Sequence, residues 1–405
     1  MLETKRAGLP REVFVLISAA FVIALGYGIV APVLPTYARE FGVSIGAASA
    51  IVSSFALMRL LFAPASGQLV QKFGEKRIYL SGLAIVALST GACALADSYW
   101  QLLFLRSLGG IGSTMFTVSA MGLLIRISPS HMRARISSLY SGSFLVGSIG
   151  GPVLGAAFAS FGLRAPFVIY SLALIIACVV VATALGNSPL SEEQAQDQRP
   201  ALTLRRALQL RPYRSALGAN FANGWASFGV RVSLVPMFVV EAFQYSPAAA
   251  GLAMTAYAVG NAAVIIPAGR LSDRYGRRPF ICAGFGVAGL ATVFLGMAPE
   301  LWVCLALSAL AGVGTGVATP SQQAVIADVI GSRARGGQVL STFQMVSDLG
   351  AVLGPLVIGF LADAAGYSVA FAVTGAILLS GSLLWLLTPD TRSRTETREI
   401  PIVDG

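Results

Sequence analysis

Long apolar stretches alternate with short polar loops along almost the whole chain. A helix needs about 20 apolar residues to cross the roughly 30 Å hydrocarbon core of a bilayer. Most of the stretches reach this length, and charged or Pro/Gly-rich loops separate them. The pattern predicts an all-α polytopic membrane protein with twelve transmembrane helices, at residues 13–37, 45–70, 78–96, 99–125, 137–161, 165–186, 215–240, 248–271, 279–298, 301–328, 338–362 and 367–388.

The distribution of Lys and Arg predicts the orientation of these spans. With the N-terminus inside the cell, 23 of the 28 basic residues fall on inner loops, tails or helix edges. Arg39 and Arg164 fall outside, and Arg59, Arg106 and Arg231 fall within spans. Because basic residues concentrate on the cytoplasmic side, we expect a multi-pass protein of the inner (plasma) cell membrane with both termini in the cytoplasm.

The longest polar break divides the twelve spans into two sets of six. It is rich in Gln, Pro and Arg, and its stretch 201–210 is expected to lie on the membrane surface. The predicted organisation is an N-terminal half at 1–186, a cytoplasmic linker at 187–214, a C-terminal half at 215–388 and a cytoplasmic tail at 389–405.

Composition agrees with a membrane protein and narrows its chemistry. Hydrophobic residues make up 56% of the chain and charged residues 11%, too few charges to cover a soluble exterior. The net charge of +10 is spread between apolar runs, so we expect no nucleic-acid partner. The four cysteines lie in apolar runs without ligand spacing, and His131 is the only histidine. We therefore expect no metal site, no cofactor and no catalytic residue.

Motifs recur at an offset of about 200 residues, which indicates an internal repeat. The loop GRLSDRYGRR at 269–278 corresponds to GQLVQKFGEKR at 67–77, and the Gly-Pro pair at 151–152 corresponds to that at 354–355. Two related six-helix halves that both start inside imply a parallel repeat about an axis normal to the membrane. The predicted fold is therefore two pseudo-symmetric six-helix bundles.

Four motifs resemble those of the major facilitator superfamily, and in particular its twelve-span drug:proton antiporters of the multidrug and tetracycline efflux type. GRLSDRYGRR resembles the superfamily's loop between the second and third helix of a half. GSIGGPVLGA at 147–156 resembles the antiporter motif, LGYGIVAPVLP at 25–35 the first helix of the drug-efflux branch, and LRSLGGIG at 105–112 the fourth-helix Arg-Gly motif. The resemblance covers nearly the whole chain and implies a monomeric secondary transporter that works by alternating access.

The two copies of the charged loop differ. In the second copy, a carboxylate at Asp273 can accept hydrogen bonds from the first amides of a neighbouring helix. The resemblance implies that this loop holds the two halves together in the outward-facing state, and the alternative is that its positive charges only orient the chain. The first copy has Gln71 at the Asp position, so an asymmetric gate is expected. The predicted gating residues are Gly67, Gln71, Gly74, Gly269, Asp273, Gly276 and Arg277.

Glycines recur every four residues on one face of the fifth helix, and a similar arrangement occurs in the eleventh. Small residues let helices approach closely, and a proline within a helix removes a backbone donor and bends it. We expect these residues to form a rocking surface and a sealed interface, or simply ordinary glycine-mediated packing. They are Gly147, Gly151, Pro152, Gly155, Gly354 and Pro355.

Three ionisable residues within the spans are candidates for proton coupling. An ionised side chain at mid-membrane costs at least about 2.5–3.5 kcal/mol, so it usually faces a cavity or a partner. Arg59 and Asp348 lie at equal depth in helices that face each other in the superfamily, which predicts an ion pair that couples protonation to the change of state. Alternatively, Asp348 is satisfied by Ser347 or the backbone, and Arg59 by water. Arg106 resembles the family's fourth-helix Arg, with proton transfer and a structural role both open.

Aromatic and amide side chains on the spans are expected to line the substrate cavity. Aromatic faces suit planar or cationic compounds, and a mostly apolar lining with few polar anchors suits broad specificity. The same side chains can equally pack against helices or face lipid, and Arg231 can pair with an acidic substrate group or only line the cavity. The predicted lining residues are Tyr27, Asn220, Asn223, Trp225, Arg231, Tyr257, Asn261, Phe343 and Gln344.

These features together predict a proton-coupled antiporter that exports small amphiphilic, drug-like compounds. The chain has no GxxxxGK[ST] phosphate loop, so the energy must come from a gradient or from the substrate. The expected partners are the small-molecule substrate, protons and the lipid bilayer. The alternatives are an exporter of one metabolite, such as a sugar or natural product, and a facilitated uniporter. A receptor or an enzyme has less support, because neither a sensor domain nor a catalytic cluster is visible.

Overall fold

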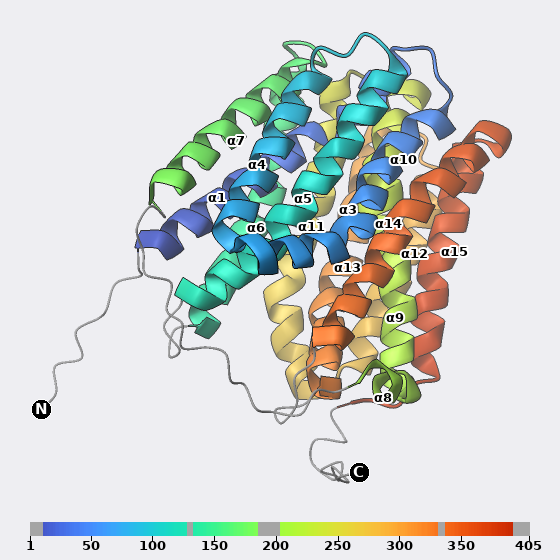
Figure 1. The fold of residues 1–405 in the computed structure, drawn as a ribbon. Helices are drawn as coiled ribbons and strands as arrows, with labels where there is room; N and C mark the ends of the chain where they lie inside the picture. The colour runs from blue at the N-terminus through green and yellow to red at the C-terminus, as the bar shows by residue number, and fades with distance from the viewer. Residues whose placement is uncertain (1–10, 128–132, 185–202, 331–336, 392–405) are drawn as a thin grey trace, which may run out of the picture. The chain divides into compact units, whose positions relative to one another are not determined.

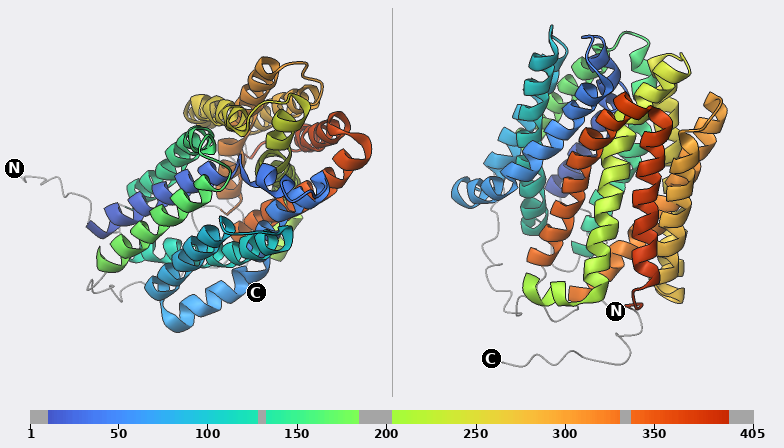
Figure 2. Two further views of the ribbon diagram at one scale, coloured as in Figure 1. Left: turned by 90° about the horizontal axis from the view of Figure 1, so that it is seen from above. Right: turned by 90° about the vertical axis from the view of Figure 1, so that its right-hand side faces the viewer.

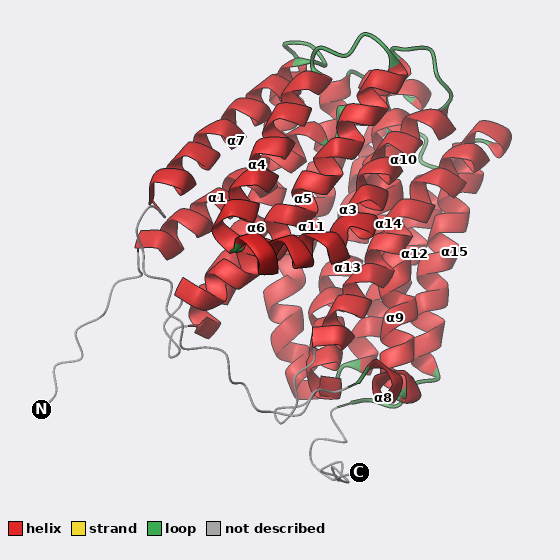
Figure 3. Cartoon of the chain, viewed as in Figure 1, coloured by secondary structure: helices red, strands yellow, loops and turns green. Residues whose placement is uncertain are grey.

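The computed structural model describes residues 11–127, 133–184, 203–330 and 337–391. All regular secondary structure in these ranges is helical (Figure 3). Long helices follow one another through short turns (Figure 1). The helices are α1 (Arg11–Val30), α2 (Leu34–Arg39), α3 (Ile45–Phe73), α4 (Glu75–Cys93), α5 (Tyr99–Ile127), α6 (Arg133–Ala159), α7 (Ala165–Ala184), α8 (Leu204–Gln209), α9 (Arg211–Asn223), η2 (Gly224–Val230), α10 (Arg231–Met237), η3 (Phe238–Ala242), α11 (Pro247–Tyr275), α12 (Arg278–Leu295), α13 (Leu301–Ile330), α14 (Gly337–Ala365) and α15 (Tyr367–Leu386).

Each of the twelve predicted spans corresponds to one long helical segment of the described chain. The seventh segment, Arg211–Ala242, is continuous but contains the π-helical stretches η2 and η3. Eleven of the segments are long and apolar enough to cross a membrane. The remaining one, α4, begins with Glu75, Lys76 and Arg77, which shorten its apolar part. The predicted all-α polytopic architecture is confirmed.

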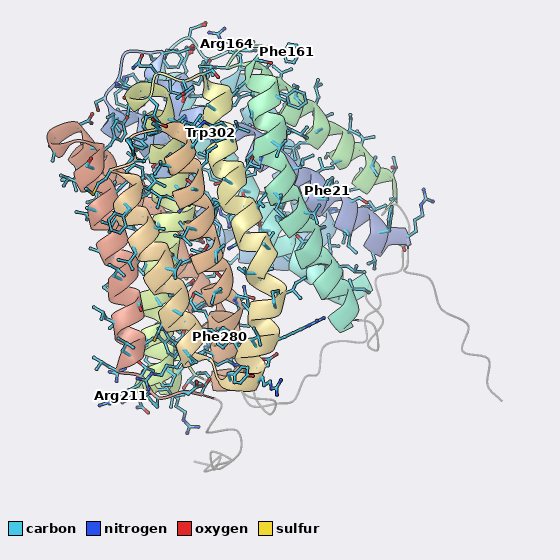
Figure 4. The ribbon with its side chains drawn as sticks, turned by 180° about the vertical axis from the view of Figure 1, so that it is seen from behind. Phe21, Phe161, Arg164, Arg211, Phe280 and Trp302 are labelled. Carbon is cyan, nitrogen blue, oxygen red and sulfur yellow. The ribbon has the colours of Figure 1, made fainter. Side chains whose placement is uncertain are left out.

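Large apolar side chains are exposed on the outer faces of the helices. Phe161 in the turn before α7 is 79% exposed, and Trp302 in α13 is 74% exposed (Figure 4). Large exposed apolar patches are uncommon on soluble proteins. In a bilayer these side chains meet hydrocarbon, and Trp is enriched where hydrocarbon meets water. Their exposure therefore agrees with a multi-pass membrane protein.

The helices form two compact units. The first comprises Met1–Val33 and Leu57–Asp197, and the second comprises Leu34–Ala56 and Gln198–Gly405. The division falls inside α3, so that α2 and the first part of α3 belong to the second unit.

Corresponding helices pack in the same pairs within each unit. In the first unit, α4 packs against α5 and α7, and α1 packs against α6 and α7. In the second unit, α12 packs against α13 and α15, while the α9–η2 segment packs against α14 and α15. Figure 2 shows α9, α14 and α15 running side by side. This correspondence is what an internal repeat of one six-helix arrangement requires.

The predicted surface stretch 201–210 forms α8 at the start of α9. Ala207 is buried in the same apolar cluster as Tyr213 and Trp385. The Tyr213 hydroxyl donates to the Val339 carbonyl oxygen at 2.9 Å, which ties α9 to α14 at this end. One face of α8 therefore packs on the second unit, while residues 201 and 202 lie outside the described ranges, as does His131.

Candidate transport site

A glycine seam brings α6 into backbone contact with α1 in the first unit. A Cβ on Gly147, Gly151 or Gly155 would lie 2.8, 2.5 or 2.5 Å from a backbone oxygen of α1. From the other side, a Cβ on Gly28 would lie 2.8 Å from the Cδ of Pro152. These distances leave no room for a side chain, so only glycine permits the approach.

The second unit has a corresponding seam between α14 and the α9–η2 segment. A Cβ on Gly224 would overlap the carbonyl oxygen of Ser347, and a Cβ on Gly354 would lie 2.8 Å from the carbonyl oxygen of Trp225. Pro355 packs against the same π-helical segment. The seam holds η2 in place. Side chains of η2 and of α10, the helix that follows it, form part of the candidate site. The rocking role of both seams stays a prediction.

A chain of hydrogen bonds crosses the interior of the second unit from η2 to α11 and α13. The Ser227 hydroxyl donates to the side-chain oxygen of Asn223 at 3.0 Å. The Tyr257 hydroxyl donates to Ser227 Oγ at 3.0 Å and lies 2.8 Å from Thr315 Oγ1. Asn261 Nδ2 donates to the same Thr315 oxygen at 3.1 Å. These five residues are called the polar network below.

The polar network contains three of the predicted lining residues and two that sequence reasoning missed. Asn223, Tyr257 and Asn261 were expected from their amide or aromatic side chains. Ser227 and Thr315 were not, because hydroxyl residues are frequent in membrane helices, where they usually bond to their own backbone. The spacing of four residues from Asn223 to Ser227 was the available signal, since it places both on one face of the helix.

Arg231 lies next to the polar network and has no charged partner among the residues that the structure describes. Its guanidinium carbon is 3.7 Å from the centroid of the Tyr257 ring. The residue is only 6% exposed. Within the described ranges, Nε and Nη1 have no hydrogen-bond partner, and no salt bridge includes Arg231. The Tyr257 ring therefore supplies a cation–π contact to this guanidinium.

The other predicted lining residues take different positions. The Asn220 side chain donates to the Phe343 carbonyl oxygen at 2.7 Å and so joins α9 to α14. Trp225 is buried within the seam. Tyr27 belongs to the first unit and is partly buried. Gln344 is exposed on α14. The substrate-lining role of all nine residues stays a prediction.

The charged candidates have polar neighbours within their own units. Arg59 Nη1 lies 3.5 Å from Ser113 Oγ in the first unit. Asp348 Oδ1 accepts a hydrogen bond from Gln344 Nε2 at 3.1 Å in the second, so its local partner is Gln344 and not the expected Ser347. Arg106 is 5% exposed within the first unit. Arg59 and Asp348 belong to different units, so their pairing stays a prediction.

The charged loop between α11 and α12 is held by ion pairs. Arg277 forms salt bridges with Asp273 and, from Nε to Oδ2 at 3.4 Å, with Asp328. Its Nη1 also donates to Ser272 Oγ at 3.3 Å. Burial alone would lower the pKa of Arg277, but the hydrogen bond to Asp273 and the charge of Asp328 outweigh it and raise the pKa. Arg277 therefore remains a cation.

A carboxylate that sequence reasoning missed caps the helix after this loop. Gly276 turns the chain with φ +100°. The two oxygens of Asp390 accept hydrogen bonds from the backbone amides of Arg277 and Arg278 at 3.2 and 3.1 Å. A Cβ on Gly276 would overlap Asp390. No local signal reveals the contact, because Asp390 lies more than 110 residues further along the chain. The role expected of Asp273 toward a neighbouring helix stays a prediction.

The first copy of the loop turns in the same way. Gly74 has φ +83°, a left-handed conformation that favours glycine. A Cβ on Gly67 would meet nothing within 4 Å, and one on Gly269 would make only an ordinary contact at 3.6 Å. The side chain of Gln71 lies outside the described part of the structure.

A second charged cluster lies at the opposite end of the second unit. Figure 4 marks this end by Trp302 and the α11–α12 end by Phe280 and Arg211. Arg39 Nε donates to Glu241 Oε1 at 2.6 Å, and the Tyr367 hydroxyl donates to Glu241 Oε2 at 2.8 Å. Asp363 accepts hydrogen bonds from the first two amides of α3 at 2.9 and 2.7 Å. A carboxylate suits a helix N-terminus because the amides there lack partners within the helix.

Comparison with known proteins places the chain among transporters. The family model described as Major Facilitator Superfamily matches residues 16–230 and 216–402. The quinolone resistance protein NorA of Staphylococcus aureus (strain MRSA252) is 26% identical over 96% of this chain and 100% of its own. The class G tetracycline resistance protein of Vibrio anguillarum is 28% identical over 90% of this chain and 92% of its own.

Solved structures show the same fold. A bacterial homolog of the human lysosomal transporter Spinster superposes with a TM-score of 0.80 at 18% identity, covering 96% of this chain and 98% of that chain. The D-xylose-proton symporter superposes with a TM-score of 0.76 at 15% identity, covering 94% and 99%. Family model, relatives and fold agree along the whole length, and the chain belongs to the major facilitator superfamily of membrane transporters.

Proposed function

We propose that the protein exports small amphiphilic, drug-like compounds in exchange for protons, by alternating access. The observation that carries this proposal is the similarity to a quinolone resistance protein and to a tetracycline resistance protein over at least 90% of each chain. Both relatives are named for resistance to aromatic drugs. The superfamily provides transport, and these relatives favour drug export over uptake.

The geometry of the second unit supports a binding site for such compounds. The polar network lies on α9, η2, α11 and α13, beside the seam that fixes η2. It offers several hydroxyl and amide groups, with the aromatic side chain of Tyr257 among them. A few polar anchors in an otherwise apolar interior orient a ligand without demanding one shape. We propose that Tyr27, Trp225 and Phe343 complete the lining.

Asp348 is proposed to carry the coupling proton, with Arg59 as its partner across the two halves and Arg106 assisting proton movement. Asp348 lies in the interior of α14, far from either helix end. An acid within a span is costly, so such residues are rare and usually functional. We further propose that the protein is a monomer with both termini in the cytoplasm, and that 1–186 and 215–388 act as the two moving halves.

Transport in proteoliposomes with an imposed pH gradient tests this proposal. Purified wild type, Asp348→Asn and the control Glu300→Gln are compared at equal protein with ethidium as the dye. Glu300 is an exposed acid in the turn before α13 and serves as a matched loss of charge. We expect gradient-driven dye movement in wild type and Glu300→Gln, and loss of the dependence on the gradient in Asp348→Asn. Dye movement that is equal with and without a gradient would instead establish facilitated transport.

A growth assay distinguishes the proposed drug export from the alternative, export of a single metabolite. Cells that express the protein are exposed to a panel of unrelated drugs and dyes. Protection against several unrelated compounds supports the proposed drug export. Protection against one compound or none favours the metabolite exporter.

A further inference from the structure

Arg231 is the most unusual charge in the described part of the second unit, because it is buried and unbalanced. A buried cation normally pairs with an acid, since the loss of hydration is otherwise uncompensated. Stacking on the Tyr257 ring recovers part of this cost. It leaves Nε and Nη1 without an acceptor, and such unsatisfied donors are rare in protein interiors.

The described acids of the second unit do not supply the missing partner. Glu241, the acid of the same helical segment, lies ten residues away, which is about 15 Å at 1.5 Å per residue, and it is bound to Arg39 and Tyr367. The others bond to Arg277, to Gln344 or to helix amides, or are exposed. They are Glu40, Asp273, Glu300, Asp328, Asp348, Asp363 and Asp390.

Further buried groups around the interior of this unit also lack acceptors. The indole nitrogen of Trp225 and the amide nitrogen of Gln322 have no hydrogen-bond partner within the described ranges. Both groups are donors. The interior therefore has an excess of hydrogen-bond donors and one uncompensated positive charge. A ligand with acceptor oxygens and a negative charge satisfies both, whereas a cationic ligand would meet repulsion from Arg231.

We propose that Arg231 binds a carboxylate of the exported compound, and thus that the preferred substrates are aromatic acids or zwitterions and not simple cations. Within this proposal, Tyr257 holds the guanidinium from one face and leaves its nitrogen atoms for the ligand. The Tyr257 hydroxyl is engaged by the polar network, which fixes the ring in place. The inference rests on the proposed transport function and adds a chemical class of substrate to it.

A pair of compounds that differ only in the carboxylate tests the proposal. Norfloxacin and its methyl ester are compared as inhibitors of gradient-driven ethidium transport in proteoliposomes. A hydrogen bond to a charged group favours the acid by about tenfold or more. We expect the acid to inhibit wild type at a concentration about tenfold lower than the ester does.

Substitutions then assign the preference to Arg231. In Arg231→Gln, the ratio of ester to acid potency is expected to fall to about one, because the cation that binds the carboxylate is gone. Arg231→Lys keeps the charge and is expected to retain part of the ratio. The control Arg164→Gln removes an Arg that is paired with Asp97 outside the spans and should keep the wild-type ratio.

The outcomes separate this inference from the transport function. Equal potency of acid and ester on wild type overturns the inference, whether or not any variant folds. An unchanged ratio in a folded Arg231→Gln overturns it as well. If wild type moves neither ethidium nor norfloxacin along the pH gradient, the proposed export fails, and the thermal shift of detergent-purified protein by acid and by ester still decides the inference. The inference is supported if the acid raises the unfolding temperature more than the ester does and if Arg231→Lys or Arg231→Gln reduces this difference. Equal shifts by acid and ester contradict the inference.

Discussion

Two arginines in different regions of the second unit have opposite kinds of surroundings. In the loop between α11 and α12, Arg277 bonds with Asp273, Asp328 and Ser272. In the interior, the guanidinium of Arg231 stacks on the Tyr257 ring and pairs with no acid of the described chain. The charge and hydrogen-bond donors of Arg277 are satisfied by side chains of the protein itself, so no ligand is needed to balance them. In contrast, Nε and Nη1 of Arg231 lack hydrogen-bond acceptors within the described ranges. This unmet need is the basis of the proposed ligand contact.

The largest expected effect comes from disturbing the seam that positions η2 and the interior site. A Cβ on Gly224 would overlap the Ser347 carbonyl oxygen, so Gly224→Ala must separate η2 from α14. We expect a loss of about 3 kcal/mol or more of stability, seen as a lower unfolding temperature of the purified protein. The matched change at the loop end, Gly269→Ala, meets only Pro320 Cβ at 3.6 Å. It should not lower the unfolding temperature, and equal losses in both variants would contradict the close contact.

Removal of the loop cation is expected to destabilise the protein. Arg277→Met leaves the carboxylate of Asp328, which is 22% exposed, without its ionic partner. Such a loss costs about 1–3 kcal/mol, and the exposed Asp273 adds little. The unfolding temperature of the purified variant should therefore fall. Arg277→Lys keeps the charge and should recover part of the loss, and an unaltered unfolding temperature in Arg277→Met would show that the network is not structural.

Removal of the interior cation Arg231 should leave the stability of the protein unchanged or raise it slightly. Arg231→Met replaces an unpaired buried charge by an apolar side chain of similar length, which is often neutral or stabilising. The lost stacking on Tyr257 offsets about 0.5–2 kcal/mol of this gain. We expect an unfolding temperature equal to or slightly above wild type, measured beside Arg277→Met. A fall as large as that of Arg277→Met would mean that Arg231 has a structural partner, and would remove the contrast between the two regions.

The smallest effect is expected from the hydroxyl of Tyr257. Tyr257→Phe removes its bonds to Ser227 and Thr315 but keeps the ring under Arg231. Ser227 and Thr315 retain Asn223 and Asn261, so the loss should be about 0.5–1.5 kcal/mol. In Tyr257→Phe, the acid should still inhibit ethidium transport at a lower concentration than the ester does. Tyr257→Leu, which removes the ring, is the comparison variant, and a preference that is lost in Tyr257→Phe would place the selectivity on the hydroxyl.

Much of the fold could be predicted from the sequence. Apolar length and charged loops are local properties, so they placed a long helical segment at each of the twelve predicted positions, of which eleven are long and apolar enough to cross a membrane. The offset between the two loop motifs predicted the repeat, and corresponding helices do pack in the same pairs. The π-helical course of the seventh segment was not predicted, because η2 and η3 have the same apolar composition as an ordinary helix.

The candidate site was predicted less completely. Side-chain type singled out Arg231, Tyr257, Asn223 and Asn261, since charged, aromatic and amide groups are costly or distinctive within a span. Ser227 and Thr315 remained hidden because their hydroxyl groups look ordinary in any membrane helix. Asp390 and Asp363 bond to amides more than 110 residues away, and no local pattern encodes such a contact.

The sequence by itself determined the all-helical membrane architecture, the repeat, the family and the residue types within the spans. The architecture follows from the cost of placing polar groups in hydrocarbon, which applies to each residue separately, while the repeat and the family follow from motifs along the chain. Only the tertiary structure decided which of those residues meet. The charge of an arginine is balanced by atoms on other helices: Arg277 pairs with Asp328, whereas Arg231 stacks on the ring of Tyr257 and forms no salt bridge within the described ranges.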